Sequence, residues 1–211
     1  MTAFLKYLLA IIAVSYASLV HAEGEGSTAP NPAQIRTYYD QISAEWDPVP
    51  VGVLNAFVAA EDRGFYDTAP QFSPLTQQLS SWFALPQQTS KLQKTAISFV
   101  IAEALSTDEI LRWYVNAVYL GEKCFGVEGA AKAYFGKTVG DLSVPEIATL
   151  AALPKAPMFY HSEKSYEKAL ARRNFVLSEM AIAGFITEDA ARTARQTDLI
   201  SRSPISPCKE E

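Results

Sequence analysis

The sequence predicts a mainly α-helical protein. Three segments have the form of a helix-opening capping box, in which a Ser side chain is followed three residues later by Glu or Gln. Behind these segments, apolar residues recur at the three- and four-residue spacing of a buried helix face. Convincing period-2 strands with turn residues at both ends are absent. We therefore expect helices packed around one core.

The first 22 residues are a separate segment. Lys6 gives a positive start, and residues 7–22 contain no Asp, Glu, Lys or Arg. The segment ends in Val20-His21-Ala22, with small residues at the two positions that a signal peptidase reads. A membrane-spanning helix needs about 20 apolar residues, so this run is short. We predict that residues 1–22 are a cleaved export signal rather than a retained anchor.

The rest of the chain divides by composition. Residues 23–34 are mostly Gly, Ser, Pro and small polar residues, which predicts a flexible linker. Residues 196–211 are rich in Pro and Ser, and we expect a loose tail. Residues 35–195 remain, and their length is sufficient for a single domain with a buried core.

The helices of this domain are predicted in chain order. The first runs from Val51 to about Arg63, because Pro48 and Pro50 argue against a strand at its start. The others have the following boundaries: a capping box at Ser90 and an end near Leu105; a capping box at Ser106 and a stop at Gly121; a capping box at Ser143 and an end at Pro154; Ser165 to Ala183, closed by Gly184; and a short last helix capped by Thr187.

Charge and composition exclude several classes of protein. Hydrophobic residues make up 49% and charged residues 19%, which is typical of a folded globular chain. The net charge is −5, and Lys and Arg form no run. These values argue against a nucleic-acid partner and against a polybasic membrane patch.

Few side chains remain for metal or nucleophilic chemistry. Removal of residues 1–22 leaves His161 as the one histidine, so a His-rich metal site is not available and a Ser-His-Asp triad would depend on that residue. Cys124 and Cys208 are too few and too far apart for a zinc site, and either one disulfide or two free thiols fits them. We expect no metal and no cofactor. Any catalysis would then use carboxylates.

Glu61 is the carboxylate best placed for such a role. On the helix that starts at Val51, it follows Leu54 and Val58 on one stripe and therefore leans toward the core near the helix C-terminus. Burial and the negative end of the helix dipole both disfavour its charged form, which suits a group that exchanges a proton. The alternative is a salt bridge with Arg63 or Lys137 that fixes the helix end.

Six segments of the chain, in order, resemble the motifs of one family. They are Glu61 to Tyr66, Ser73 to Leu79, Ile110 to Gly121, Gly126 to Lys137, Asp141 to Pro157, and Arg172 to Met180. The family is the family 51 glycosyltransferases, which are the peptidoglycan transglycosylase domains of bifunctional penicillin-binding proteins and of their monofunctional relatives. The resemblance covers roughly Val49 to Arg192.

The resemblance implies a lysozyme-like, mostly helical fold and a peptidoglycan-related substrate. It implies that Glu61 is the general base, which takes the proton from the 4-hydroxyl of the acceptor sugar while that oxygen attacks the anomeric carbon of a lipid-linked donor. It also implies a cleft in which Glu61 lies near Gln77, Gln78 and Asn116. The predicted substrate-binding residues are Asp62, Arg63, Phe65, Ser73, Gln77, Gln78, Lys91 and Asn116. For the polar members of this set, buried and satisfied hydrogen bonding is the alternative.

The chain departs from the family pattern in its first half. The segment between the first two motifs is shortened to residues 67–72, where the family usually has a longer, lipid-gripping stretch. At the positions that normally hold the donor pyrophosphate, our alignment places Ser81, Ser90 and Lys91. The expected second glutamate falls on Lys94, and no Asp or Glu lies between Asp67 and Glu103.

Three functions fit this pattern. The first is a reduced peptidoglycan glycosyltransferase, and the second is a lytic enzyme that cleaves glycan with a single acid. The third is a non-catalytic module that binds glycan strands or a cell-wall synthase. The expected partner is a peptidoglycan precursor or glycan strand, with a synthase and the membrane surface as further candidates. The expected location is the periplasm or the outer side of the inner membrane.

Overall fold

The computed structural model describes residues 30–83, 90–155, 163–199 and 208. These residues are mostly helical, and among them the extended pairing is limited to one isolated bridge between Tyr119 and Phe125. The mainly α class is therefore confirmed. The export signal predicted over residues 1–22, most of the linker, His161 and most of the tail lie outside the described residues.

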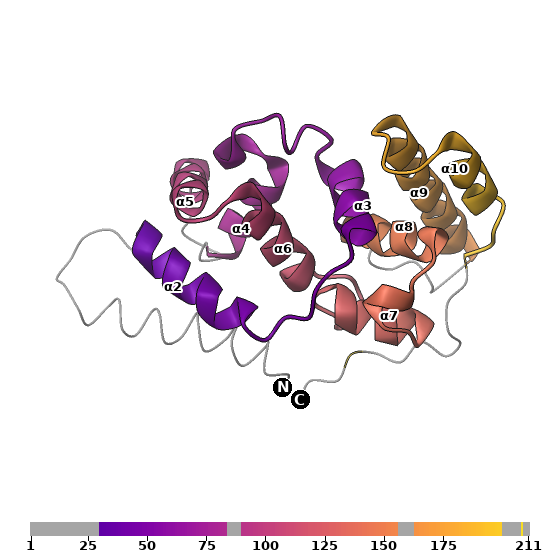
Figure 1. Cartoon of the computed structure of the whole chain (residues 1–211), viewed down its shortest axis with the longest axis horizontal. Helices are drawn as coiled ribbons and strands as arrows, with labels where there is room; N and C mark the ends of the chain where they lie inside the picture. The colour runs from indigo at the N-terminus through magenta and orange to yellow at the C-terminus, as the bar shows by residue number, and fades with distance from the viewer. Residues whose placement is uncertain (1–29, 84–89, 156–162, 200–207, 209–211) are drawn as a thin grey trace. The chain divides into compact units, whose positions relative to one another are not determined.

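The described helices, which are labelled in Figure 1, belong to two compact units. Of the described residues, those up to Trp46 and those within Ala69–Ile110 belong to the first unit. Those within Asp47–Thr68 and Leu111–Cys208 belong to the second. The first unit holds α2 (Pro32–Ser43), η1 (Pro70–Phe72), α4 (Pro74–Trp82) and α5 (Lys91–Ala104). The second holds α3 (Val51–Glu61), α7 (Val127–Phe135), η2 (Val139–Asp141), α8 (Val144–Ala152), η3 (Leu153–Lys155), α9 (Glu163–Ile182) and α10 (Glu188–Arg195). The helix α6 (Thr107–Ala117) begins in the first unit and continues into the second.

The predicted capping boxes open α5, α6 and α8, as the sequence indicates. The backbone N–H of Ser90 donates to Gln93 Oε1 at 2.7 Å, that of Ser106 to Glu109 Oε2 at 2.8 Å, and that of Ser143 to Glu146 Oε2 at 2.8 Å. Each bond satisfies a donor that a helix start leaves without an intrahelical partner. The helices α4 and α7 were not among the predicted elements.

The helix α2 corrects the predicted linker. We expected residues 23–34 to be flexible, but α2 begins at Pro32 with Asn31 as its cap. Asn31 Oδ1 accepts from the Gln34 N–H at 2.9 Å, and Gln34 Oε1 accepts from the Asn31 N–H at 2.9 Å. Asn and Pro are common in loops, but they are equally favoured at the cap and first position of a helix. Its buried face packs against α5.

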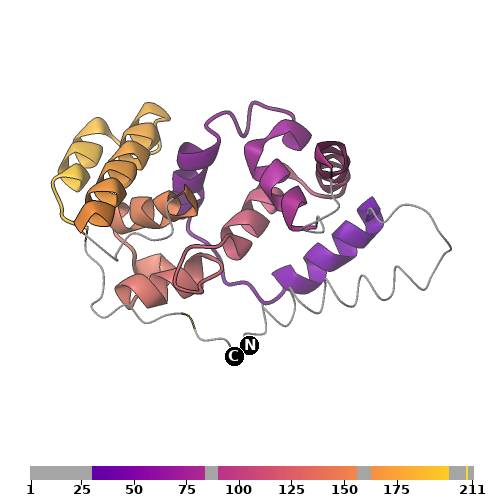
Figure 2. The same ribbon diagram turned by 180° about the vertical axis from the view of Figure 1, so that it is seen from behind.

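The helix α3 lies in the core of the second unit, where it packs against α8 and α9. Pro50 occupies its N-cap position, which excludes the strand considered for this segment. Phe57 is completely buried and meets Tyr114 edge to face, with ring centroids 6.1 Å apart. The helix ends at Glu61, slightly before the expected Arg63, because Asp62 leaves the helical conformation at φ −158°. The helices α9 and α10 lie side by side in both views (Figures 1 and 2).

A tight loop follows α6 and is fixed by a disulfide. Gly121, Glu122 and Lys123 have φ values of 81°, 48° and 61°, which are all in the left-handed region. Cys124 forms a disulfide with Cys208, so the pairing that the sequence left open is present. The Cys208 N–H also donates to the Glu122 carbonyl at 3.0 Å. Cys208 is thereby held against this loop.

Gly126 closes this loop against the end of α6. Its φ is 77°, and a Cβ built on it would lie 2.4 Å from the carbonyl oxygen of Asn116. That distance is shorter than real Cβ contacts allow. Glycine is therefore required here both for its conformation and for the close approach of the backbone.

Candidate functional site

Glu61 lies at the C-terminal end of α3, and its side chain is only 8% exposed. Lys155 Nζ lies 3.0 Å from Glu61 Oε2, and Arg172 Nη2 lies 3.9 Å from Glu61 Oε1. The expected burial of Glu61 is present. The alternative of a salt bridge between Glu61 and Arg63 or Lys137 is wrong, because both residues pair with other carboxylates. Arg63 pairs with Glu179 at 2.8 Å and Lys137 with Glu146 at 2.8 Å.

The same two cations bind the end of the helix backbone. The Ala60 carbonyl accepts a hydrogen bond from Arg172 Nη2 at 3.0 Å and a longer one from Lys155 Nζ at 3.5 Å. Carbonyls of the last helical turn have no intrahelical partner and carry the negative end of the helix dipole. The cations from η3 and α9 therefore fix both the helix end and the carboxylate.

Two buried polar atoms of this cluster have no hydrogen-bond partner. They are Glu61 Oε1, which is an acceptor, and Arg172 Nε, which is a donor. Arg172 is held from its other side by Phe175, because its guanidinium carbon lies 4.7 Å from the ring centroid. Burial raises the pKa of Tyr114, and the negative charge of Glu61 raises it further, so the Tyr114 hydroxyl stays protonated. A buried carboxylate with an unused oxygen can accept a proton, or a hydrogen bond that a hydroxyl group donates.

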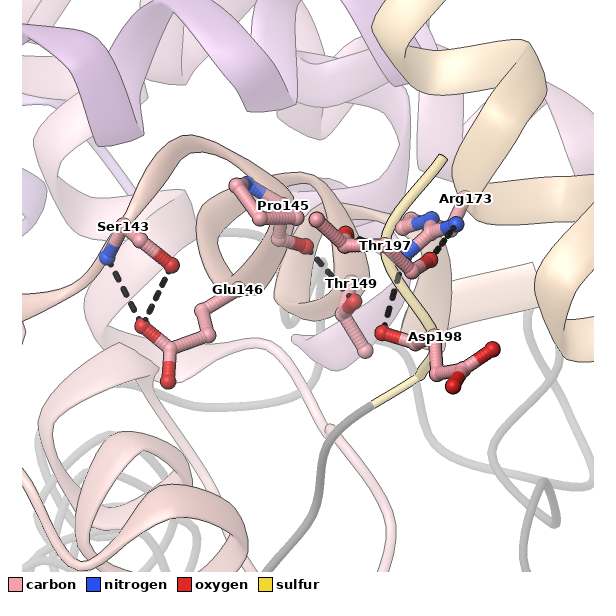
Figure 3. Close-up of a pocket in the computed structure, with 7 residues that line it drawn as sticks. All are labelled: Ser143, Pro145, Glu146, Thr149, Arg173, Thr197 and Asp198. Carbon is pink, nitrogen blue, oxygen red and sulfur yellow. Dashed lines mark hydrogen bonds between the residues drawn. The ribbon is translucent and has the colours of Figure 1, made fainter. Parts of the chain in front are cut away.

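A second buried carboxylate, Glu146 on α8, is fully bonded. Lys137 Nζ donates to its two oxygens at 2.8 and 3.0 Å, and the Ser143 N–H and hydroxyl donate to Oε2 at 2.8 and 2.7 Å. Burial alone would raise the pKa of Glu146, but the bonds from Lys137 and Ser143 outweigh it and lower the pKa below its ordinary value of 4.5. Figure 3 shows the Ser143 bonds.

These bonds predict a loss of stability in acid. A carboxyl whose folded pKa is lowered contributes stability above the unfolded pKa near 4.5, and the contribution is lost as pH falls through the lower folded pKa. We expect Glu146→Gln to lower the free energy of unfolding at pH 7 by about 1.5–3 kcal/mol. The difference from wild type should shrink below pH 4.5 in urea unfolding curves. Asp189→Asn, at a side chain that is 82% exposed, is the control. An equal deficit for Glu146→Gln at pH 7 and pH 3 would contradict the assignment.

Glu146 also lines a pocket of about 250 Å³ in the second unit (Figure 3). The pocket is lined by Ser143, Pro145, Glu146, Thr149, Arg173, Thr197 and Asp198. Arg173 is 1% exposed and donates to the backbone carbonyls of Arg195, Thr197 and Asp198, with a shortest distance of 2.8 Å to Thr197. These bonds hold the segment after α10 against α9. The role of Arg173 here is structural.

The other residues predicted near Glu61 occupy its helix end and the turn that follows. Asp62 is the C-cap of α3, and Arg63 is half-exposed and paired with Glu179. Phe65 is completely buried and packs edge to face on Tyr66, with centroids 5.2 Å apart. Phe65 therefore belongs to the core, and the contact with substrate predicted for it stays a prediction.

The remaining predicted residues are divided between the two units. Ser73, Gln77, Gln78 and Lys91 lie in the first unit, and Asn116 lies in the second. A cleft that joins Glu61, Gln77, Gln78 and Asn116 would use residues of both units, and it stays a prediction.

Several of these side chains make local bonds. Ser73 is buried and caps α4, with its hydroxyl oxygen 3.1 Å from the Leu75 nitrogen. Gln77 Nε2 donates to the Gln71 carbonyl at 2.7 Å and to Ser98 Oγ at 2.8 Å. Asn116 Nδ2 donates to the Arg112 carbonyl at 2.8 Å. These bonds agree with the alternative of satisfied, partly buried hydrogen bonding.

Lys91 and Lys94 lie in the first turn of α5, where Lys91 is exposed. Ser90 and Gln93 form the capping box of this helix and bond to each other's backbone N–H groups.

Among the described residues, no group of three or more His, Cys, Asp or Glu side chains could hold a metal ion. In the same part of the chain, no helix combines the length and apolar character that a membrane crossing requires.

Sequence reasoning assigned no role to Lys155 or Arg172. Both lie within segments that resemble the family motifs, but nothing local connects them with Glu61, which is more than 90 residues away. One general signal was available: an acid at a helix C-terminus needs a nearby cation. That signal cannot say which of the Lys and Arg residues supplies it.

Comparison with known proteins identifies the family. The transglycosylase family matches residues 72–181, which is just over half of the chain, and this range begins after Glu61. Penicillin-binding protein 1A of Escherichia coli (strain K12) is 36% identical over 180 residues, covering 72% of this chain and 21% of the relative. Penicillin-binding protein 1A of Vibrio cholerae is 41% identical over 149 residues, covering 68% of this chain and 18% of the relative.

A solved structure is also similar to part of the chain. The crystal structure of penicillin-binding protein 1A from Haemophilus influenzae has a TM-score of 0.48 and 27% identity, and the match covers 73% of this chain and 17% of that one. The chain spans about a fifth of the length of the curated relatives that it matches. The extent of the family match shows that this chain belongs to the transglycosylase family.

Proposed function

We propose that the protein is a peptidoglycan glycosyltransferase in which Glu61 is the general base. The observation that carries this proposal is a carboxylate that is 8% exposed, has one oxygen without a hydrogen bond, and lies at a helix end fixed by two cations. Family membership supplies the reaction class. A proton acceptor needs this combination of fixed position, partial desolvation and unused acceptor capacity.

In the proposed reaction, the acceptor is the 4-hydroxyl of a glycan sugar and the donor is a lipid-linked disaccharide. Glu61 takes the hydroxyl proton while that oxygen forms a bond to the anomeric carbon of the donor. The bond from that carbon to the lipid diphosphate breaks, and the diphosphate leaves with the electron pair. The protein would carry out this step after export, on the outer side of the inner membrane.

A second candidate is a module that binds glycan strands without turnover. The observation that favours it is the ion pair between Glu61 Oε2 and Lys155 Nζ, because a carboxylate oxygen engaged by a cation is less accessible to an incoming hydroxyl. Of the three positions aligned with the family's phosphate ligands, two carry Ser81 and Ser90 and only one carries a cation, Lys91, which points the same way.

One assay separates the candidates. The protein lacking residues 1–22 is incubated with lipid-linked disaccharide and, separately, with purified sacculi. We expect glycan polymer from the first incubation and no soluble fragments from the second. Soluble muropeptides from sacculi would indicate a lytic enzyme instead. Co-sedimentation with sacculi in the absence of both products would indicate the binding module, and either result would overturn the proposal.

A further inference from the structure

The ion pair of Glu61 is much less complete than the ion pair of Glu146. The two carboxylates are similarly buried, with side chains 8% and 10% exposed, and their lysines are similarly accessible, at 50% for Lys155 and 42% for Lys137. Glu146 accepts four hydrogen bonds from Lys137 and Ser143. Glu61 has one close cation at 3.0 Å and another at 3.9 Å, and its Oε1 accepts no bond. Lys155 is therefore held at Glu61 by far fewer interactions than Lys137 is at Glu146.

The two cations at Glu61 differ in how firmly they are held. Arg172 is 20% exposed, donates to the Ala60 carbonyl at 3.0 Å and stacks on Phe175. Lys155 is half-exposed, and its distance of 3.5 Å to the same carbonyl is at the limit for a hydrogen bond. A lysine ammonium on a flexible stem also changes partner more easily than a stacked guanidinium. Lys155 can therefore leave Glu61 while Arg172 stays.

We propose that Lys155 is an exchangeable cation that pairs with Glu61 at rest and moves to the diphosphate of the bound donor. This inference rests on the proposed function. While Lys155 is at Glu61, it occupies Oε2 and leaves only Oε1 open to the acceptor hydroxyl. When Lys155 moves, Glu61 remains buried beside Arg172 alone, and both of its oxygens can then accept from the acceptor hydroxyl.

The exchange places each charge where the reaction needs it. The acceptor hydroxyl loses its proton to Glu61, its oxygen bonds to the anomeric carbon, and the bond from that carbon to the diphosphate oxygen breaks. Negative charge then develops on the leaving diphosphate, which the Lys155 ammonium stabilises. Arrival of the anionic donor thus both activates the base and supplies the leaving group with a counter-charge.

Binding of geranyl diphosphate tests this exchange without requiring turnover. Calorimetry at fixed ionic strength compares the wild type with Lys155→Met, Lys155→Arg and Glu61→Gln. We expect Lys155→Met to weaken binding about tenfold, because one charge-assisted contact is lost. Lys155→Arg should bind within about threefold of wild type, since the charge is kept. Glu61→Gln should tighten binding by about three- to tenfold, because it releases Lys155 from its carboxylate.

The Lys137–Glu146 pair is the matched control, since it has the same charge types and similar burial. Lys137→Met and Glu146→Gln should change the Kd less than twofold, and thermal melting confirms that each variant is folded. Three results would overturn the exchange. The first is an equal change in Kd at both pairs, and the second is an unchanged Kd for Lys155→Met and Glu61→Gln. The third is no binding of geranyl diphosphate by the wild type or by Glu61→Gln.

The outcomes also separate this inference from the proposed function. The expected binding pattern without any polymer from lipid-linked disaccharide would leave the exchange standing and remove the glycosyltransferase. If the protein forms polymer but substitutions at Lys155 and Glu61 leave the Kd for geranyl diphosphate unchanged, the glycosyltransferase stands and the exchange is removed.

Discussion

Glu61→Gln is expected to lower the polymerisation of lipid-linked disaccharide by about 100- to 10,000-fold, which is the usual contribution of one positioned proton-transfer group. Gln keeps the length and shape of the side chain but cannot accept the hydroxyl proton. The measurement is the initial rate of glycan polymer formed from lipid-linked disaccharide, normalised to folded protein.

Two controls make this prediction specific. Lys132→Ala removes an exposed lysine that pairs with Glu128 within α7, and it should leave the rate unchanged. Lys94→Ala should have a much smaller effect than Glu61→Gln, because the glutamate that would support a phosphate site is absent from the first half of the chain. If Lys94→Ala abolished polymerisation while Glu61→Gln remained active, the base would be elsewhere.

The second large effect concerns the disulfide between Cys124 and Cys208. These residues are 84 positions apart, so the bond closes a long loop in the unfolded chain. By loop-closure entropy alone, reduction should lower the free energy of unfolding by about 4–5 kcal/mol. Urea unfolding with and without a thiol reductant measures the difference.

A variant without the bond completes this experiment. Cys124→Ala combined with Cys208→Ala should show the lowered stability and no response to reductant. Thiol titration shows when the wild type is fully reduced. If the fully reduced protein had the same urea midpoint as the oxidised protein, the disulfide would not stabilise this fold.

The local parts of the fold were predictable, and the reason is visible at α5, α6 and α8. Their starts are set by hydrogen bonds between residues three apart, such as Ser90 with Gln93, which a sequence displays directly. The burial of Glu61 was also predictable, because its place on the Leu54–Val58 stripe follows from helix periodicity. The prediction of a linker at the start of α2 was wrong, because Asn31 and Pro32 are compatible with both a loop and a helix cap.

The chemistry at Glu61 could not be predicted from local pattern. Lys155 and Arg172 reach the end of α3 from positions 95 and 112 residues beyond Ala60, and only the packing of α3 on α8 and α9 brings them there. The same holds for the choice between a disulfide and free thiols, which depends on where the chain carries Cys208. A sequence does not show which of several distant residues contacts a given side chain, because tertiary packing determines that choice.

The close approach at Gly126 limits how this fold can be redesigned. A computational redesign of the loop could change Glu122 or Lys123 and stay compatible with the backbone, because Asn or Gly readily adopts positive φ. No such freedom exists at Gly126, where even a methyl group would overlap the Asn116 carbonyl. By contrast, the space around Gly184 is open, so only its φ of 75° restricts the choice there. Only glycine is therefore compatible with position 126 in any sequence that keeps this loop packed against the end of α6.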